Sequence, residues 1–385
     1  MVQYKSVVHS KLPKVGDTIF SKMSNLAASE NALNLSQGFP DFDCSPQLIE
    51  LVGQAMRNGH NQYAPMAGLL SLREMIADKT FELYQREYNP ETEITITAGA
   101  TQAIFTAIAA TVSENDEVIL FTPAYDCYEP AIELVGGKPV YVQLKEPDYT
   151  INWEEVKKVI NQRTKMIIIN SPHNPTGTTL SKEDLAELDK LTAQSDMLVL
   201  SDEVYEHIIF DGEGHHSAAS FPKLAERSFI ISSFGKTYHT TGWKVGYCLA
   251  PENLTKEFRK THQYNVFCVN TPIQHAYAEF LKDKSEYSQL GTFYQEKRDF
   301  FINLLKDSRF KLQKTKGTYF QLLNYEAISD EADVDFAIRL TKAHKVAAIP
   351  VSVFYNSNID HKVLRFCFAK QNQTLEEAAE ILCKL

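Results

Sequence analysis

Strand-like and helix-like segments alternate through the middle of the chain, and this alternation constrains the fold more than any other feature. Seven apolar runs have the length of strands, and segments with helical periodicity separate most of them. The strands are expected at 94–97, 117–121, 139–142, 166–169, 197–200, 229–231 and 245–249. Because these runs are almost continuously apolar, we expect an α/β fold with a mostly parallel seven-stranded sheet that helices cover on both faces.

The pattern changes near residue 252. Long helices are expected there, followed by a smaller α+β part with strands at 319–323, 347–350 and 363–368. Residues 1–45 show no clear periodicity and are expected to be irregular. We therefore predict a large domain of residues 46–275, and a small domain made of residues 1–45 together with 276–385.

Charge and cysteine usage exclude several classes of protein. The chain has 385 residues and a formal net charge of -10, which argues against a nucleic-acid partner or an anionic membrane surface. The 6 cysteines form no CxxC pair, so free thiols in a reducing compartment are expected. The first residues lack the apolar core of a signal peptide, and no run is long enough to span a membrane. These features predict a cytoplasmic protein.

Polar residues follow the ends of the predicted strands. In an open parallel sheet, ligands bind beyond the carboxyl ends of the strands, so these residues are expected to share one rim. The small residues after strand 94–97 precede a helix, where backbone amides can hold a phosphate. The residues at this rim are Gly99, Ala100, Thr101, Tyr125, Asn174, Asp202, Tyr205, Ser233 and Lys236.

A lysine near the sheet rim is the candidate nucleophile. An amine in a dry, crowded site has a lowered pKa and becomes nucleophilic. Residue chemistry alone does not choose between Lys236 and Lys244. The rim as a whole suits a flat, phosphorylated heteroaromatic aldehyde, which a lysine can bind as a Schiff base. Taken singly, each residue also has a plainer interpretation: Asp202 as a helix cap, Asn174 as part of a turn, and Tyr125 as core.

Several motifs occur in the order found in one enzyme family. They are Asn174-Pro175-Thr176-Gly177, Ser201-Asp202-Glu203-Val204-Tyr205, Ser233-Phe234-Gly235-Lys236, Gly242-Trp243-Lys244-Val245-Gly246 and a late Arg365. With them, the whole chain resembles the class I aminotransferases, which have the pyridoxal-phosphate-dependent transferase fold type I. The resemblance implies pyridoxal 5'-phosphate as cofactor, amino acids and 2-oxo acids as substrates, and a homodimer with shared active sites.

The resemblance also assigns a role to each residue. Lys236 resembles the lysine that forms the Schiff base, and Asp202 the carboxylate that pairs with the pyridine nitrogen. Asn174 and Tyr205 match groups that bond the ring 3′-oxygen, and Tyr125 matches the stacking aromatic. The phosphate site is implied at Gly99, Ala100, Thr101, Ser233 and Lys244, with Tyr63 reaching the neighbouring subunit's phosphate. Arg365, Gly38 and Asn174 match residues that bind the substrate carboxylate. Many relatives have arginine where this chain has Lys244.

The loops around Gly38, Tyr63 and Tyr125 narrow the resemblance to the kynurenine/glutamine transaminase subgroup, and within it to bacterial methionine aminotransferases. Methionine, aromatic or other uncharged amino acids are the implied substrates. A carbon–sulfur β-lyase using the same site remains the alternative.

Other kinds of site are disfavoured. No GxGxxG motif opens a strand–helix turn, which argues against a nicotinamide dehydrogenase. No metal site is expected, because Glu206-His207 and His215-His216 lack a third ligand at a useful spacing. We expect both pairs on a solvated surface.

Overall fold

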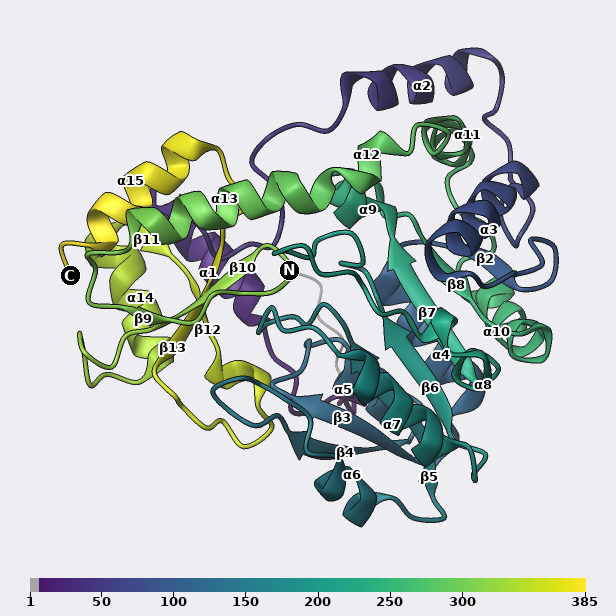
Figure 1. Ribbon diagram of the computed structural model, residues 1–385, viewed down its shortest axis with the longest axis horizontal. Coiled ribbons are helices and arrows are strands. Elements are labelled where there is room, and N and C mark those ends of the chain that lie inside the picture. The colour runs from purple at the N-terminus through teal and green to yellow at the C-terminus, as the bar shows by residue number, and fades with distance from the viewer. Residues whose placement is uncertain (1–6) are drawn as a thin grey trace.

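A seven-stranded sheet dominates the computed structural model, which describes residues 7–385 (Figure 1). Its strand order is β2-β8-β7-β6-β5-β3-β4. The strands are β2 (Ile94–Thr97), β3 (Glu117–Thr122), β4 (Lys138–Gln143), β5 (Thr164–Asn170), β6 (Leu198–Asp202), β7 (Ser228–Ser233) and β8 (Gly246–Leu249). Only β8 runs antiparallel to its neighbours, β2 and β7. The predicted mostly parallel seven-stranded sheet is confirmed.

Helices cover both faces of this sheet because its strands are apolar on both sides. Successive side chains of a strand point to opposite faces, so Ile167 and Ile169 of β5 enter one core and Met166 and Ile168 the other. The first core contains residues of α2 (Pro46–Arg57), α3 (Leu70–Tyr84), α6 (Trp153–Val159), α7 (Lys182–Thr192), α8 (Pro222–Ala225), α11 (Thr271–Phe280) and α12 (Ser285–Ser288). The second contains residues of α4 (Ala100–Thr111), α5 (Tyr128–Leu134) and α10 (Glu252–Asn265).

A smaller α+β part lies on the left of Figure 1 and has its own core. Its four-stranded sheet has the order β12-β13-β10-β9, and a separate pair joins β1 to β11. The strands are β1 (Leu33–Asn34), β9 (Lys311–Leu312), β10 (Phe320–Asn324), β11 (Val346–Ala347), β12 (Ile349–Pro350) and β13 (Val363–Cys367). The helices are α1 (Ile19–Ser29), α14 (Asp333–His344), α15 (Asn372–Leu382) and the long α13 (Leu290–Leu304), which connects the two parts.

Two predictions of local structure are wrong. Residues 1–45 are not all irregular, because α1 and β1 lie there; the Thr18 hydroxyl caps α1 by accepting from the Ser21 amide at 3.2 Å. The predicted strand 347–350 is split between two sheets, since β11 pairs with β1 and β12 with β13. The apolar residues Ile19, Phe20, Met23 and Leu26 of α1 pack against the core of the smaller part, at a helical spacing that the first prediction missed.

The domain boundaries after residues 45 and 275 stay a prediction, and residues 1–6 of the predicted small domain lie outside the described residues. The parallel pairing of β1 with β11 supports this division. So does the bond from the Cys367 amide to the Leu35 carbonyl at 2.8 Å. Both contacts attach the N-terminal segment to the C-terminal part rather than to the large sheet, and we propose the two domains on that basis.

Three further features of residues 7–385 bear on the chemistry that the chain can support. No helix in this range is long and apolar enough to cross a membrane. No group of three or more His, Cys, Asp or Glu side chains is arranged to hold a metal ion. The cysteines are all free thiols.

Candidate active site

A cavity of about 130 Å³ lies at the carboxyl ends of β5, β6 and β7, beside the first turn of α4. Most of the residues predicted from the strand ends line it: Gly99, Ala100, Thr101, Tyr125, Asn174, Asp202, Tyr205, Ser233, Lys236 and Lys244. The structure therefore brings these residues together at one rim. Gly38, Tyr63 and Arg365 do not line this cavity.

Lys236 lies on α9 (Phe234–Thr237), the short helix that follows β7. Its Nζ donates hydrogen bonds to the Gly38 carbonyl at 3.1 Å and to the Tyr319 hydroxyl at 2.9 Å. Burial of the amine, aided by the positive charge of Arg365, lowers the pKa of Lys236 to about 8. The lowered pKa increases the fraction of this amine that is uncharged near neutral pH, and the uncharged form is what a nucleophile or base requires. The contact with Tyr319 could not be predicted, because that residue belongs to the C-terminal part.

Asp202 ends β6 and is 3% exposed. Its Oδ2 accepts a hydrogen bond from the Tyr128 hydroxyl at 2.6 Å, and its Oδ1 accepts one from the Val204 amide at 3.3 Å. Burial raises the pKa of the Asp202 carboxyl to about 6, although these hydrogen bonds and Lys236 act in the opposite direction. No sequence motif assigned Tyr128 a role in the site; it is the first residue of α5. Its position in the first turn of α5 is what directs it to Asp202.

A cradle for an anion forms at the N-terminus of α4. Gly99 has a φ of 82°, and a Cβ placed there would lie 3.3 Å from the Lys244 Nζ. The first amides of the helix, at Ala100 and Thr101, have no intrahelical acceptor. The Lys244 amine has no hydrogen-bond or ion-pair partner within the part of the chain that the structure describes. Free amides, a cation and the absent side chain at Gly99 together suit a phosphate group.

Arg365 lies on β13, and its side chain is buried beside the cavity. It donates to Asn174 Oδ1 at 2.7 Å and to the Ser36 carbonyl at 3.1 Å. Its Nε is buried and has no partner among residues 7–385. The guanidinium also lies over the Phe320 ring, 3.9 Å from the ring centroid. A buried guanidinium with a spare donor is suited to bind a carboxylate.

Tyr63 lies apart from the other predicted residues. Its side chain is 81% exposed, and its ring packs edge-on against Phe267 at a centroid distance of 5.1 Å. Within a single chain it has no contact with the cavity that a phosphate site would require.

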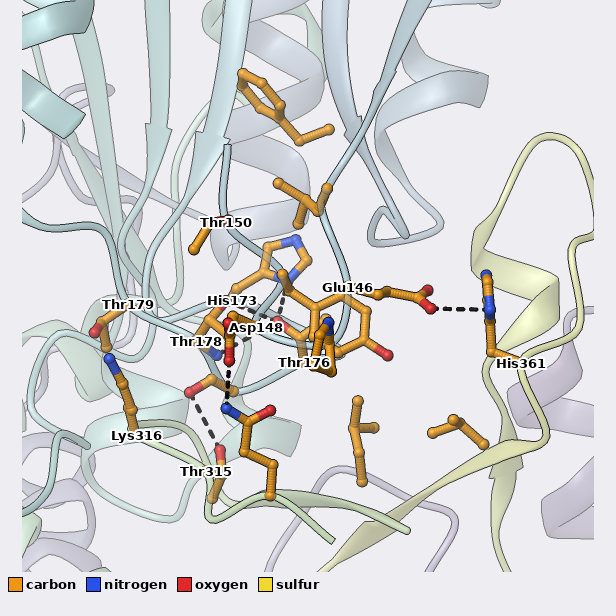
Figure 2. A pocket seen from close by; sticks show the side chains of 18 of the residues that line it. Glu146, Asp148, Thr150, His173, Thr176, Thr178, Thr179, Thr315, Lys316 and His361 are labelled. Atoms are coloured by element: carbon orange, nitrogen blue, oxygen red, sulfur yellow. Dashed lines mark hydrogen bonds and ion pairs between the residues drawn. The ribbon is translucent and has the colours of Figure 1, made fainter. Parts of the chain in front are cut away.

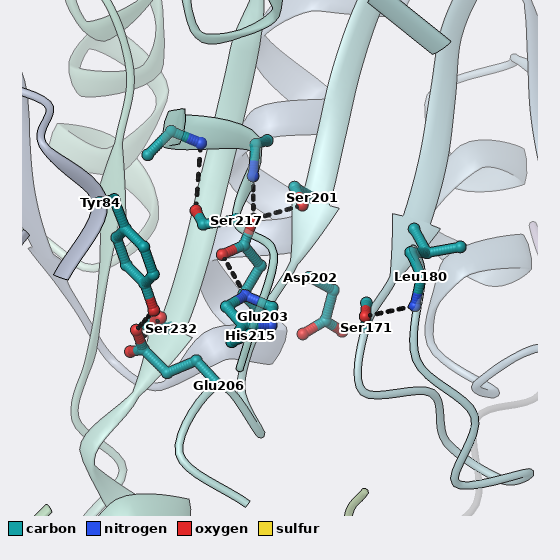
Figure 3. A network of polar contacts seen from close by, with 12 residues as sticks. Tyr84, Ser171, Leu180, Ser201, Asp202, Glu203, Glu206, His215, Ser217 and Ser232 are labelled. Atoms are coloured by element: carbon teal, nitrogen blue, oxygen red, sulfur yellow. Dashed lines mark hydrogen bonds and ion pairs between the residues drawn. The ribbon is translucent and has the colours of Figure 1, made fainter. Parts of the chain in front are cut away.

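A buried polar network surrounds Glu206, in the segment that follows β6 (Figure 3). The Glu206 carboxylate accepts from Lys79 Nζ at 2.8 Å, Tyr84 at 2.6 Å, Ser232 at 2.9 Å and Tyr247 at 3.0 Å. Burial raises the pKa of Glu206, but Lys79 and the donated hydrogen bonds outweigh it, so the pKa lies below its usual value. The carboxylate is therefore ionised.

The prediction that Glu206-His207 and His215-His216 lie on a solvated surface is wrong for three of these four residues. The side chains of Glu206, His207 and His215 are 4%, 8% and 4% exposed. His215 Nε2 lies 2.8 Å from the Glu203 carboxylate (Figure 3). Burial lowers the pKa of His207 to about 3, so this imidazole is uncharged. Lys79 and Tyr84 of α3 donate to Glu206 and so compensate the burial of its carboxylate. Both residues are distant from Glu206 in the sequence.

A second, larger cleft of about 970 Å³ separates the two parts of the chain (Figure 2). It contains none of the predicted site residues. Glu146 contacts His361 Nδ1 across it at 2.9 Å (Figure 2). Gln313 donates to Asp148 across it at 2.7 Å. Because acidic and basic side chains are mixed along its walls, its chemistry does not select one charge of ligand.

Comparisons with known proteins agree with this geometry. Residues 30–382 match the family model described as aminotransferase class I and II. The chain is 48% identical over 380 residues to the methionine aminotransferase of Escherichia coli strain K12, covering 98% of both chains. It is 36% identical over 411 residues to the kynurenine–oxoglutarate transaminase of Dictyostelium discoideum, covering 96% of this chain and 94% of that one.

Solved structures give the same result. A crystal structure from Escherichia coli, reported with a methionine aminotransferase function, has a TM-score of 0.97 at 48% identity and covers 99% of this chain and all of its own. N-succinyldiaminopimelate aminotransferase from Mycobacterium tuberculosis has a TM-score of 0.95 at 34% identity, covering 98% of this chain and 100% of its own.

Proposed function

Since the chain belongs to the class I and II aminotransferases, which are pyridoxal-phosphate-dependent transaminases of fold type I, we propose that its preferred amino donors are methionine and aromatic amino acids. The observation that carries the assignment of the site is the meeting of Lys236, Asp202 and the Gly99 cradle around one cavity. Each of these serves a different part of one cofactor, and no other cavity described above offers all three.

The residues present fit pyridoxal phosphate. The cradle between Gly99 and the unpaired Lys244 amine suits the phosphate, and the buried Asp202 carboxylate suits a protonated ring nitrogen. Ser233 and the Ala100 and Thr101 amides complete the proposed phosphate site. Tyr125 would stack on the ring, and Asn174 and Tyr205 would bond its 3′-oxygen. When bound, the cofactor supplies an aldehyde that carries the amino group and a ring that accepts the electron pair left at Cα.

The protein's own groups then bind the substrate and move a proton. Arg365 binds the α-carboxylate through its guanidinium, and the Gly38 loop, whose carbonyl bonds Lys236, lies next to it. Lys236 is the base that takes the proton from the substrate Cα, because it lines the cavity and burial lowers its pKa toward neutrality. Asp202, kept charged by Tyr128 and Lys236, retains the proton on the ring nitrogen. A second, 2-oxo acid substrate accepts the amino group in the reverse half-reaction.

The preference for uncharged side chains rests on the surroundings of Arg365. Its guanidinium lies within 5.2 Å of the Phe20 ring centroid and within 5.6 Å of that of Phe354. These aromatic groups suit a thioether or an aromatic side chain. The Escherichia coli and Dictyostelium relatives are named for methionine and kynurenine, which fit the same description.

A homodimer and a cytoplasmic location belong to the same proposal. Tyr63 is exposed beside Phe267, where a second chain would allow its hydroxyl to reach a phosphate. Sedimentation velocity at micromolar concentration should show a dimer, and a monomer at all concentrations would contradict it. The free thiols of the cysteines favour a reducing compartment.

Lys236→Ala tests the assignment of the nucleophile. We expect it to abolish steady turnover, and borohydride reduction of the wild-type enzyme should fix the cofactor to the peptide that contains Lys236. Lys244→Ala is the matched comparison: it should weaken cofactor affinity but retain turnover at saturating cofactor. Normal turnover in Lys236→Ala, or attachment at Lys244, would contradict the assignment.

A half-reaction screen tests the donor preference. Methionine, phenylalanine, kynurenine, glutamine, histidine and aspartate should be mixed with the enzyme in the absence of an oxo acid. We expect methionine and the aromatic donors to react fastest and aspartate slowest. Release of ammonia from cysteine conjugates under these conditions would instead indicate the carbon–sulfur lyase.

A further inference from the structure

The Tyr319 hydroxyl contacts the reacting amine of the proposed site, although the residue lies outside the family motifs. It accepts from Lys236 Nζ at 2.9 Å and donates to the Gly38 carbonyl at 2.5 Å. The same carbonyl accepts from Lys236 at 3.1 Å. The three groups therefore form a closed triangle of hydrogen bonds. Tyr205 packs edge-on against the Tyr319 ring at a centroid distance of 5.2 Å, which restricts the ring's orientation.

Backbone hydrogen bonds join the segment before Tyr319 to the loops that follow β5 and β6 of the large sheet. The Thr318 amide bonds to the Ile208 carbonyl at 3.0 Å, and the Gly317 amide bonds to the Gly177 carbonyl at 2.8 Å. The Tyr319 carbonyl accepts from the Phe368 amide at 2.9 Å. The Tyr319 hydroxyl is thus held at a fixed place relative to Lys236, on a loop bonded to both parts of the chain.

An uncharged lysine amine has two N–H bonds and one lone pair, and these contacts determine where the lone pair points. Tyr319 and Gly38 accept one N–H bond each. Neither residue lines the cavity, whereas Lys236 does. The direction left for the lone pair is therefore the one away from both acceptors, on the cavity side.

We propose that Tyr319 is a positioning residue for Lys236: with the Gly38 carbonyl it holds both N–H bonds of the free amine, so that the lone pair faces the substrate Cα. This role rests on the proposed function of Lys236 as the base. When the amine takes the Cα proton, the C–H bond breaks, its electron pair passes to the cofactor ring, and the new N–H bond forms from the oriented lone pair. The two existing N–H bonds stay in place.

Tyr319→Phe removes the hydroxyl and keeps the ring. Tyr294→Phe is the matched control, because the Tyr294 hydroxyl is buried without a partner among residues 7–385 and its ring lies 5.5 Å from that of Tyr319. In Tyr319→Phe we expect kcat to fall about 10- to 100-fold, with KM for the amino acid changing less than about 3-fold, because orientation is lost and binding is not. Tyr294→Phe should match the wild type.

A second readout uses the cofactor-free enzyme and does not depend on turnover. Acylation of Lys236 by acetic anhydride, followed by peptide mass spectrometry, gives the pH at which the amine becomes reactive. Tyr319→Phe removes an acceptor that favours the ammonium form, so this midpoint should move down by roughly 0.5 to 1 pH unit. Tyr294→Phe should leave it unchanged. Circular dichroism and thermal unfolding confirm that both variants are folded.

A kcat within twofold of wild type together with an unchanged acylation midpoint in Tyr319→Phe would overturn the proposal. An equal loss in Tyr294→Phe would also overturn it, because packing rather than the hydroxyl would then be responsible. If Lys236→Ala keeps its turnover, the proposed function fails instead, and the acylation profile still reports on the contact between Tyr319 and Lys236.

Discussion

Among residues 7–385, only Lys79 brings a full positive charge into hydrogen-bond distance of the buried Glu206 carboxylate, and Lys79→Met removes it. The two side chains are 6% and 4% exposed, and their charged atoms lie 2.8 Å apart. Methionine has a similar length and fills the same space without charge. The carboxylate keeps its three hydroxyl donors, while the substitution removes the charge of Lys79 together with its contact to His207 Nε2, which lies 3.0 Å from Lys79 Nζ.

Removing one partner of a buried ion pair leaves the other charge without compensation, which costs about 3–5 kcal/mol. For a chain of 385 residues, the unfolding entropy is roughly 0.8 kcal/mol per kelvin, so the midpoint of thermal unfolding should fall by about 4–6 °C. An exposed ion pair provides the control. Lys256 and Glu252 lie 2.7 Å apart with side chains 66% and 51% exposed, and Lys256→Met should change stability by less than about 1 kcal/mol.

The stability that Lys79→Met loses depends on pH, because the substitution reverses the direction in which the pKa of Glu206 is shifted. In the wild type the folded pKa is lowered, so the ionised carboxylate stabilises the fold above the unfolded pKa, and this stability is lost as the pH falls through the folded value. Without Lys79, burial dominates and the folded pKa rises above the unfolded one. The stability contributed by the group is then present below the unfolded pKa and is lost as the pH rises. The difference in the free energy of unfolding between wild type and Lys79→Met should therefore be larger at pH 8 than at pH 5.

Urea unfolding followed by circular dichroism at pH 5 and pH 8 gives the free energy of unfolding of the wild type, Lys79→Met and Lys256→Met. It therefore measures both the loss of stability and its dependence on pH. A loss below about 1 kcal/mol for Lys79→Met at pH 8 would refute the reasoning, because it lies in the range of an exposed pair. A loss equal at the two pH values would refute the assigned role of charge.

Three further substitutions test backbone strain, the ring-nitrogen partner and carboxylate binding. Gly177→Ala should destabilise by about 2–4 kcal/mol in thermal unfolding, since φ is +72° and the new Cβ would lie 1.7 Å from Thr315 Oγ1; Gly212→Ala, with φ +75° and open space, should lose only about 1 kcal/mol. Asp202→Asn should lower kcat by about 10²-fold or more while cofactor absorbance persists, because the ring nitrogen loses its charged partner; unchanged kcat would exclude that pairing. Arg365→Lys should raise KM for the amino acid by about 10-fold or more in steady-state assays, because the planar fork is lost; an unaltered KM would place the carboxylate elsewhere.

The large sheet and the cavity could be predicted from the sequence because both depend on short-range patterns. Each strand is a local apolar run, and the residues that follow it must lie at the same rim once the strands are parallel. Lys236 and Asp202 were therefore found together without knowledge of the loops between them. The family motifs added the roles, since they occur in order along the chain.

The remaining contacts depend on residues that are distant in sequence. Glu206 resembled a surface residue because its donors, Lys79 and Tyr84, come from α3, 127 and 122 residues earlier. Tyr319 lies 83 residues after Lys236 and in another part of the fold. No periodicity or spacing connects such partners, so only the tertiary structure shows that a buried charge is compensated or that an amine is oriented.

The place of β2 at the edge of the large sheet has a consequence for synthesis of the chain. Within the part of the chain that the structure describes, its sheet neighbour is β8 alone, with Thr97 opposite Gly246 and Ile94 opposite Leu249. A ribosome makes β2 early and β8 much later, so β2 has no sheet partner until the chain has grown past Leu249. The Gly99 turn and Lys244 flank this same pair of strands. A nascent chain therefore cannot hold a phosphate at this place until nearly two thirds of it has been translated, and cofactor capture must follow closure of the sheet.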